Sequence, residues 1–195
     1  MQSGKLLKLL KERGAILEGH FLLTSGRHSN VYFEKFRILE NPAALDEACM
    51  EMAEIVNDQD IELVLGAAIG GILIAGGVGR HLGVKHIFSE RVNGKMELRR
   101  GFSIGKGQRL VIVEDIITTG GSMLELIELA EEQDAEIVCL VNLVNRSSGD
   151  VDLGVPSTSL LTIPSESWEH ENCPLCKQGI AITQRGSTGK KMETV

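Results

Sequence analysis

The sequence predicts an α/β fold with a doubly wound, mainly parallel central sheet flanked by helices. Apolar strand runs at roughly 61–66, 84–89, 109–115 and 137–144 alternate with helical patterns, which is the order of βαβ units. These runs are rich in Val, Ile and Leu, as expected for strands covered on both faces. Two of them end in small-residue turns that lead directly into a helical pattern, so the sheet should carry ligand-binding loops at one edge.

The length and composition predict one hydrophobic core. The chain has 195 residues, of which 43% are hydrophobic, and this is enough for a single domain. Within the domain 1–195 we expect an N-terminal helix and hairpin hood at 1–40 and a core at 41–165. An irregular C-terminal segment and tail should follow at 166–195.

The charge balance excludes several classes of function. A net charge of −7 argues against a general binder of nucleic acids or membrane surfaces. No apolar run approaches the length of a membrane span, and the N-terminus lacks the apolar core of a signal peptide. We therefore expect a cytoplasmic protein without nucleic-acid or membrane partners.

The N-terminal segment predicts a helix over 4–13, ended by Gly14, and then a hairpin over 15–37. Ser25-Gly26 supplies its turn. Tyr32 and Phe33 lie on the second strand. Two interpretations remain open for these aromatic residues: they pack in the core of a hood, or they cover a flat base.

The central stretch is Val111–Ser122, where a β-branched run ends in Glu114 and Asp115. A Thr/Gly turn, Thr118–Ser122, follows, and then a helical pattern to Glu132. Backbone amides and hydroxyls at a helix N-terminus favour an anion, and the carboxylates before them can accept hydrogen bonds from ribose hydroxyls. A plain βα connection is the alternative. Two acids together with the hydroxyls favour a sugar-phosphate site.

A second small-residue loop, Gly66–Gly71, connects the strand at 61–66 to a helix at 72–82 that follows an earlier helix opening at Pro42. Glycines let a backbone approach a ligand closely, and the helix start suits a second anion. Close packing between helix and strand also requires glycine. The presence of two such loops favours ligand binding.

Positive charge is concentrated at 91–106, which contains Arg91, Lys95, Arg99, Arg100 and Lys106. Such a run is usually a solvated hairpin or loop. Beside two anion-binding loops, a mobile cationic lid over a polyphosphate is the interpretation we favour.

Arg146 follows the strand at 137–144, which places it at the ligand side of an open α/β sheet. The alternative is a surface arginine paired with Asp150 or Asp152. Of the four cysteines, Cys49 and Cys139 should be buried thiols. Cys173 and Cys176 could bind zinc or form a disulfide. Because only His170 lies nearby in sequence, the ligand set looks incomplete, and a loop with reduced thiols is favoured.

The stretch Val111–Ser122 closely resembles the phosphoribosyl-pyrophosphate motif of type I phosphoribosyltransferases. The wider chain, from about residue 5 to 150, resembles the orotate phosphoribosyltransferase family, whose hood motif is similar to Phe21–Ser29 with Tyr32-Phe33. Residues 171–179 also resemble the C-terminal motif of one bacterial branch. The resemblance implies transfer of a phosphoribosyl group from phosphoribosyl pyrophosphate (PRPP) to orotate, with Mg²⁺ held mainly through PRPP, in a homodimer.

The resemblance also implies roles for individual residues. Glu114 and Asp115 hold the ribose hydroxyls, and Arg91 and Lys95 neutralise the departing pyrophosphate, acting on the site of the neighbouring subunit. Arg146, Thr118 and the hood aromatics Tyr32 and Phe33 bind orotate. The remaining PRPP contacts come from two turns: Ile116, Ile117, Thr118, Thr119, Gly120, Gly121 and Ser122 after one strand, and Ala68, Ile69, Gly70 and Gly71 after another.

The chain departs from the better-known branch of that family at positions that carry positive charge there. Thr24 and Gly70 stand where that branch has lysines, and its mobile loop has a second Lys and a His that are missing between Arg91 and Glu97. Arg99 or Arg100 could substitute. Two alternative functions remain: a purine phosphoribosyltransferase, which Arg146 disfavours because a guanidinium fits a carboxylate, and a non-catalytic PRPP-sensing regulator.

Overall fold

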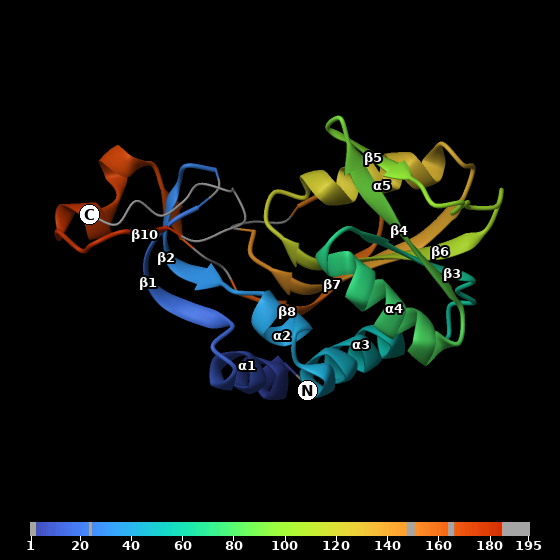
Figure 1. Cartoon of the computed structure of the whole chain (residues 1–195), viewed down its shortest axis with the longest axis horizontal. Helices are drawn as coiled ribbons and strands as arrows, with labels where there is room; N and C mark the ends of the chain where they lie inside the picture. The colour runs from blue at the N-terminus through green and yellow to red at the C-terminus, as the bar shows by residue number, and fades with distance from the viewer. Residues whose placement is uncertain (1–2, 24, 148–150, 164–165, 185–195) are drawn as a thin grey trace.

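The computed structural model describes residues 3–23, 25–147, 151–163 and 166–184. Thr24, Asp150 and the tail at 186–191 lie outside these ranges. A six-stranded sheet and a four-stranded sheet occupy opposite ends of the long axis (Figure 1). The larger sheet contains β3 (Leu63–Ala67), β4 (Lys85–Val92), β5 (Lys95–Leu98), β6 (Arg109–Ile117), β7 (Glu136–Asn145) and β8 (Ser157–Thr162), in the order β5-β4-β3-β6-β7-β8.

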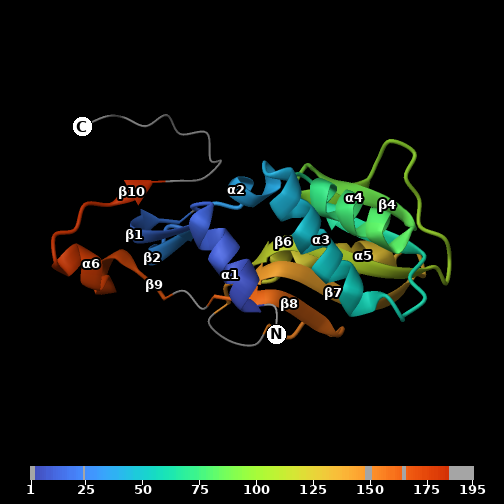
Figure 2. The ribbon, with the colours of Figure 1, turned by 90° about the horizontal axis from the view of Figure 1, so that it is seen from below.

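The six-stranded sheet is parallel except for β5, which pairs antiparallel with β4. Helices α3 (Pro42–Val56) and α4 (Gly70–Leu82) cover one face, and α5 (Gly121–Glu131) covers the other (Figure 2). This confirms the predicted fold class. The runs on β3, β6 and β7 lack polar alternation because both faces of these central strands are largely buried.

Alternate residues of β6 enter the two cores. Val111 and Val113 pack with α3 and α4, whereas Leu110 and Ile112 pack with α5. Each fully buried Leu or Ile contributes about 1.5–3 kcal/mol through apolar burial. The two layers therefore fix the position of β6, and with it the polar residues at its end.

Helix boundaries follow local chemistry. The Asn41 side chain accepts a hydrogen bond from the Ala44 amide at 3.0 Å and Pro42 takes the first turn, as suits a helix start. Gly83 ends α4 in the left-handed conformation, which glycine adopts without steric cost. Both helices lie close to their predicted ranges.

The strand order places a topological switch point between β3 and β6. The connection after β3 runs through α4 on one face to β4, and the connection after β6 runs through α5 on the other face to β7. The two loops therefore diverge at the carboxyl ends of neighbouring strands. In open α/β sheets this is where ligands bind.

The hood is a four-stranded sheet in the order β10-β1-β2-β9. Its centre is the predicted hairpin of β1 (Ile16–Leu22) and β2 (His28–Phe33), preceded by α1 (Ser3–Glu12). The C-terminal segment, expected to be irregular, adds β9 (Ser167–Trp168) and β10 (Thr183–Gln184) to the two edges, with η1 (His170–Asn172) and α6 (Pro174–Lys177) between them. That expectation was wrong because two-residue strands carry no periodic pattern.

The cationic segment begins as an ordered hairpin. β4 extends to Val92 and pairs with β5 from Val92↔Lys95 to Ser89↔Leu98. The first half of the segment at 91–106 is therefore a hairpin, which was the alternative to a mobile lid. Mobility of the segment stays a prediction. Among the described residues, no helix combines the length and apolarity that crossing a membrane requires.

Candidate active site

The acid pair lies at the carboxyl end of β6, at the switch point. Glu114 is 8% exposed and Asp115 is 2% exposed. The Glu114 carboxylate accepts a hydrogen bond from the Asp115 amide at 2.9 Å. Two buried carboxyl groups side by side are costly unless they are partnered or titrate upward, so the pair needs a compensating cation or proton.

Lys35 supplies the cation. Its Nζ lies 2.8 Å from Asp115 Oδ2, and it lies on the short connection between β2 and α2 (Phe36–Leu39). The sequence reading missed this residue because no motif marks it. The one feature of the sequence that could have indicated it is its position, directly after the second strand of the hairpin and before the core begins.

Burial raises the pKa of Glu114 from 4.5 to about 7, with the Asp115 charge adding to the effect. The Asp115 amide and the Lys35 ammonium act in the opposite direction. Near neutral pH the Glu114 carboxyl is therefore divided between its protonated and ionised forms. It can donate or accept a hydrogen bond to a sugar hydroxyl.

The turn after the acid pair is open to solvent. Thr118, Thr119, Gly121 and Ser122 are exposed, and among the residues that the structure describes no side chain caps the start of α5. Gly120 has φ +81°, and a Cβ there would lie 2.7 Å from Val151 Cγ1, so only glycine fits. Exposed amides and hydroxyls at a helix N-terminus favour an anion.

The two isoleucines of the motif are structural. Ile117 is 4% exposed and packs in the core on the α5 face, and Ile116 packs against the cluster that includes Leu143 and Val144. Only their backbones remain for a ligand. Their assignment as PRPP contacts is therefore limited to main-chain atoms.

The loop at 68–71 lies beside the acid pair. A Cβ on Gly70 would come within 1.7 Å of Asp115 Oδ2, and one on Gly66 within 2.4 Å of the Gly71 carbonyl oxygen. Gly66 and Gly71 therefore serve the helix–strand packing that was the alternative interpretation. Gly70 instead makes room for Asp115. Ile69 is 74% exposed, so the loop tip is accessible.

Arg146 lies at the end of β7 and is buried, with 9% exposure. Its Nη2 donates to the Val31 carbonyl of the hood at 2.9 Å. Its Nε has no hydrogen-bond partner within the described part of the chain, and burial lowers its pKa. This burial argues against a surface arginine, although Asp150, one of the two partners considered, lies outside the described residues. A buried guanidinium with an unused N–H is suited to an anionic acceptor.

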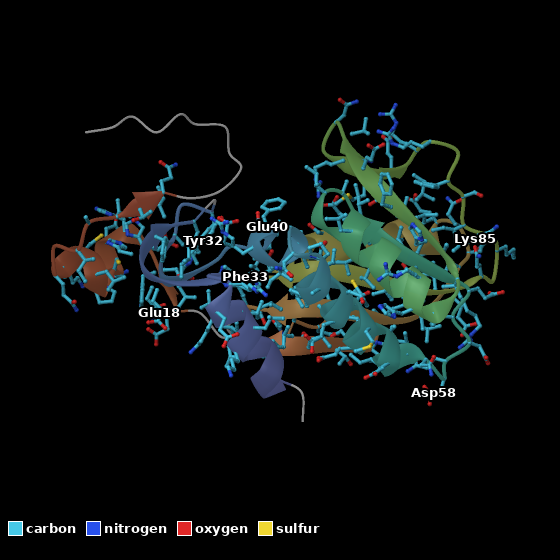
Figure 3. The ribbon with its side chains drawn as sticks, turned by 60° about the horizontal axis from the view of Figure 1, so that its bottom comes forward. Glu18, Tyr32, Phe33, Glu40, Asp58 and Lys85 are labelled. Atoms are coloured by element: carbon cyan, nitrogen blue, oxygen red, sulfur yellow. The ribbon has the colours of Figure 1, made fainter. Side chains whose placement is uncertain are left out.

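The two hood aromatics differ in their environment. Tyr32 and Phe33 (both labelled in Figure 3) are neighbours on β2, so their side chains point to opposite faces. Phe33 is 4% exposed and belongs to the core cluster with Leu10 and Ile38. Its side chain therefore packs in the core, which leaves only its main chain for the predicted contact with orotate. Tyr32 is half-buried and lies 5.6 Å from Phe21, measured between ring centroids.

Some of the basic residues predicted to form a lid over the polyphosphate are already in ion pairs. Arg91 pairs with Glu125 of α5 at 2.8 Å and Arg100 pairs with Glu90 at 2.8 Å. In the described ranges, no ion pair is found for Lys95 or Arg99. The structure therefore does not bring Arg91 or Lys95 to the acid pair of their own chain.

Two hollows lie away from this edge of the sheet. One, of about 630 Å³, lies between α3 and α4, and the other, of about 710 Å³, lies between β5 and α5. Neither is lined by the acid pair or the anion-binding turn. The candidate site follows from the chemistry at the switch point and not from concavity.

The fold and this site define a class of protein. The model of the phosphoribosyl transferase domain matches residues 37–177, which include both loops, the acid pair and Arg146. The chain belongs to this family.

Curated relatives that match nearly the full chain share one name. Orotate phosphoribosyltransferase from Desulforamulus reducens is 44% identical over 187 residues, covering 96% of this chain and 98% of the relative. The enzyme of that name from Caldicellulosiruptor bescii is 43% identical over 190 residues, covering 97% and 100%. The crystal structure of orotate phosphoribosyltransferase from Aeropyrum pernix has a TM-score of 0.68 and 28% identity, covering 84% of this chain and 94% of that one.

Proposed function

We propose that the chain transfers the phosphoribosyl group of PRPP to orotate, giving orotidine 5′-phosphate and diphosphate. The observation that carries this proposal is the buried Arg146, which lies at the same sheet edge as the phosphoribosyl motif and whose Nε has no partner among the described residues. Relatives named for this activity match almost the full chain. Adenine phosphoribosyltransferases of known structure, such as that of Leishmania tarentolae at 21% identity, share the fold alone.

Substrate positioning follows from the charges. The exposed amides and hydroxyls of Thr118–Ser122 would hold the 5′-phosphate. Glu114 and Asp115 would accept hydrogen bonds from the ribose hydroxyls beneath the ring. Arg146 would donate two parallel hydrogen bonds to the orotate carboxylate, with Tyr32 covering the base.

The reaction would be a displacement at the anomeric carbon of ribose. The bond to pyrophosphate breaks, the ring gains positive charge, and an anionic pyrimidine nitrogen forms the new bond. The nucleophile is already ionised, so no strong general base is required. The task of the protein is positioning and electrostatic stabilisation, with the acid pair facing the positive ring.

Mg²⁺ fits the donor set. Carboxylate oxygens are its preferred protein ligands, but Asp115 is already paired with Lys35 and Glu114 with an amide. Phosphate oxygens of PRPP would therefore supply most of its ligands. When bound, the ion would neutralise the charge that develops on pyrophosphate.

We further propose a homodimer in which the segment at 91–106 reaches the site of the neighbouring subunit. The exposed Lys95, without an ion pair among described residues, supports this proposal, as does the distance of the β4–β5 hairpin from the acid pair in the strand order. The cytoplasmic location stays a prediction.

The direct test is formation of orotidine 5′-phosphate from PRPP and orotate, with and without Mg²⁺. We expect turnover with Mg²⁺ and a loss of at least about tenfold after chelation, because an ion on phosphoryl oxygens contributes several kcal/mol. No product under either condition would refute the proposal. Specific nucleic-acid affinity without turnover would instead favour the regulator.

A further inference from the structure

Four metal-ligating atoms converge where the C-terminal segment packs on the hood. They come from His20 on β1, His28 on β2, Cys173 before α6 and Cys176 within α6, and all lie within 4.8 Å of one another. His20, His28 and Cys173 are buried at 3%, 4% and 0% exposure. The two histidines complete a set of four that sequence spacing alone left incomplete.

The distances agree with a tetrahedral centre. Zinc bonds of about 2.3 Å to sulfur and 2.0–2.1 Å to nitrogen place sulfur and nitrogen ligands about 3.5 Å apart at tetrahedral angles. Cys173 Sγ is 3.5 Å from His20 Nε2, and Cys176 Sγ is 3.7 Å from His20 Nε2 and 3.3 Å from His28 Nδ1. The two ring nitrogens are 2.9 Å apart, so modest separation of the rings would admit the ion.

A hydrogen bond outside the cluster orients one ligand. His20 Nδ1 lies 2.7 Å from the Ile180 carbonyl oxygen, which can only accept, so Nδ1 carries the proton. The Nε2 lone pair of the neutral ring then points at both thiols. A carbonyl that fixes the tautomer of a ligating imidazole is the usual arrangement around protein-bound metals.

We propose that His20, His28, Cys173 and Cys176 form a structural zinc site that ties the C-terminal segment to the hood hairpin. Two thiolates and two neutral imidazoles are a common closed ligand set for structural zinc. Binding would release the thiol protons to solvent. All four positions are filled by protein, so the ion has no open position for substrate and takes no part in phosphoribosyl transfer.

The site would stabilise the two edge strands of the hood sheet. β9 and β10 are two residues long, and strands this short contribute few hydrogen bonds. His28 also lies on the same strand as Tyr32, so the ion would fix the hood over the base. Because metal-binding free energy adds to folding free energy, loss of the ion should loosen the hood before the core.

Metal analysis of the purified chain, by mass spectrometry without substrate, tests the proposal independently of the proposed reaction. We expect about one zinc per chain. After replacement by Co²⁺, the visible bands of tetrahedral cobalt and a thiolate-to-cobalt charge-transfer band should appear. Cys176→Ser should lower the metal content at least about tenfold. The matched controls Cys139→Ser and His81→Ala, which lie outside the cluster, should leave it unchanged.

Two results would overturn the proposal. One is a metal content below about a tenth per chain in wild-type protein purified without chelator, with no cobalt spectrum after reconstitution. The other is alkylation of only two of the four cysteines in denatured, unreduced protein, which would show a disulfide between Cys173 and Cys176. Both measurements use the wild-type chain, so a variant that fails to fold leaves the test intact.

Discussion

Replacing Glu114 with Gln should stabilise the protein at alkaline pH while impairing it as an enzyme. Burial raises the pKa of Glu114 from 4.5 to about 7. In this pH interval the unfolded chain has lost a proton that the folded chain retains, so stability falls as pH rises. The destabilisation caused by ionising the buried Glu114 is absent below the pKa of this carboxyl in the unfolded chain. It is complete above its pKa in the folded chain. A neutral amide that keeps the 2.9 Å hydrogen bond from the Asp115 amide avoids it.

The magnitude follows from the size of the shift. A change from 4.5 to about 7 corresponds to about 3 kcal/mol, because one unit is worth about 1.4 kcal/mol. Chemical denaturation at about pH 5 and pH 8 should show the variant gaining about 2–3 kcal/mol more at the higher pH. Glu128→Gln, an exposed carboxyl on α5, should change stability by less than about 0.5 kcal/mol at both values.

Activity should move in the opposite direction. Losing a hydrogen bond to a charged group costs about 1.5–3 kcal/mol, which is about a 10- to 150-fold loss in kcat/KM. An equal change in stability at both pH values would refute the reasoning about burial. Unchanged activity would refute the role of Glu114 in holding ribose.

The other predictions concern cations. Lys35→Met should raise the pKa of Glu114 further, because Lys35 lowers it. In that background the stabilisation by Glu114→Gln should become larger and reach its full size at a higher pH; an unchanged pH profile would contradict the pairing. Lys95→Ala should slow turnover far more than Arg99→Ala in steady-state kinetics, and the reverse order would overturn the alignment of this segment. Arg146→Met should lower kcat/KM for orotate by about 10- to 1000-fold through loss of charge-assisted hydrogen bonds, while binding of PRPP, followed by calorimetry, stays within a few fold.

The parts of the fold that sequence reasoning predicted are those with strong local signals. The runs of buried β-branched residues predict β6 and β7. Asn41-Pro42 marks the start of α3, and Gly83 marks the end of α4. The sites at the ends of β3 and β6 follow from the same local patterns. Topology then brings them together, since both strands are neighbours in the sheet.

The parts that could not be predicted depend on contacts distant in sequence. Lys35 reaches Asp115 across 80 positions, and His20 meets Cys173 across 153. No spacing rule connects such residues before the fold is known. The burial of the Phe33 side chain could not be predicted for a related reason: neighbouring aromatics on a strand face opposite sides, and sequence alone did not show which side was the core.

The choice of base by the wild-type chain is measured by pyrophosphate release with PRPP, Mg²⁺ and a panel of bases. We expect release with orotate and none above background with adenine, guanine or xanthine, because the buried Arg146 guanidinium favours a carboxylate partner. Release with a purine and none with orotate would contradict the proposed function.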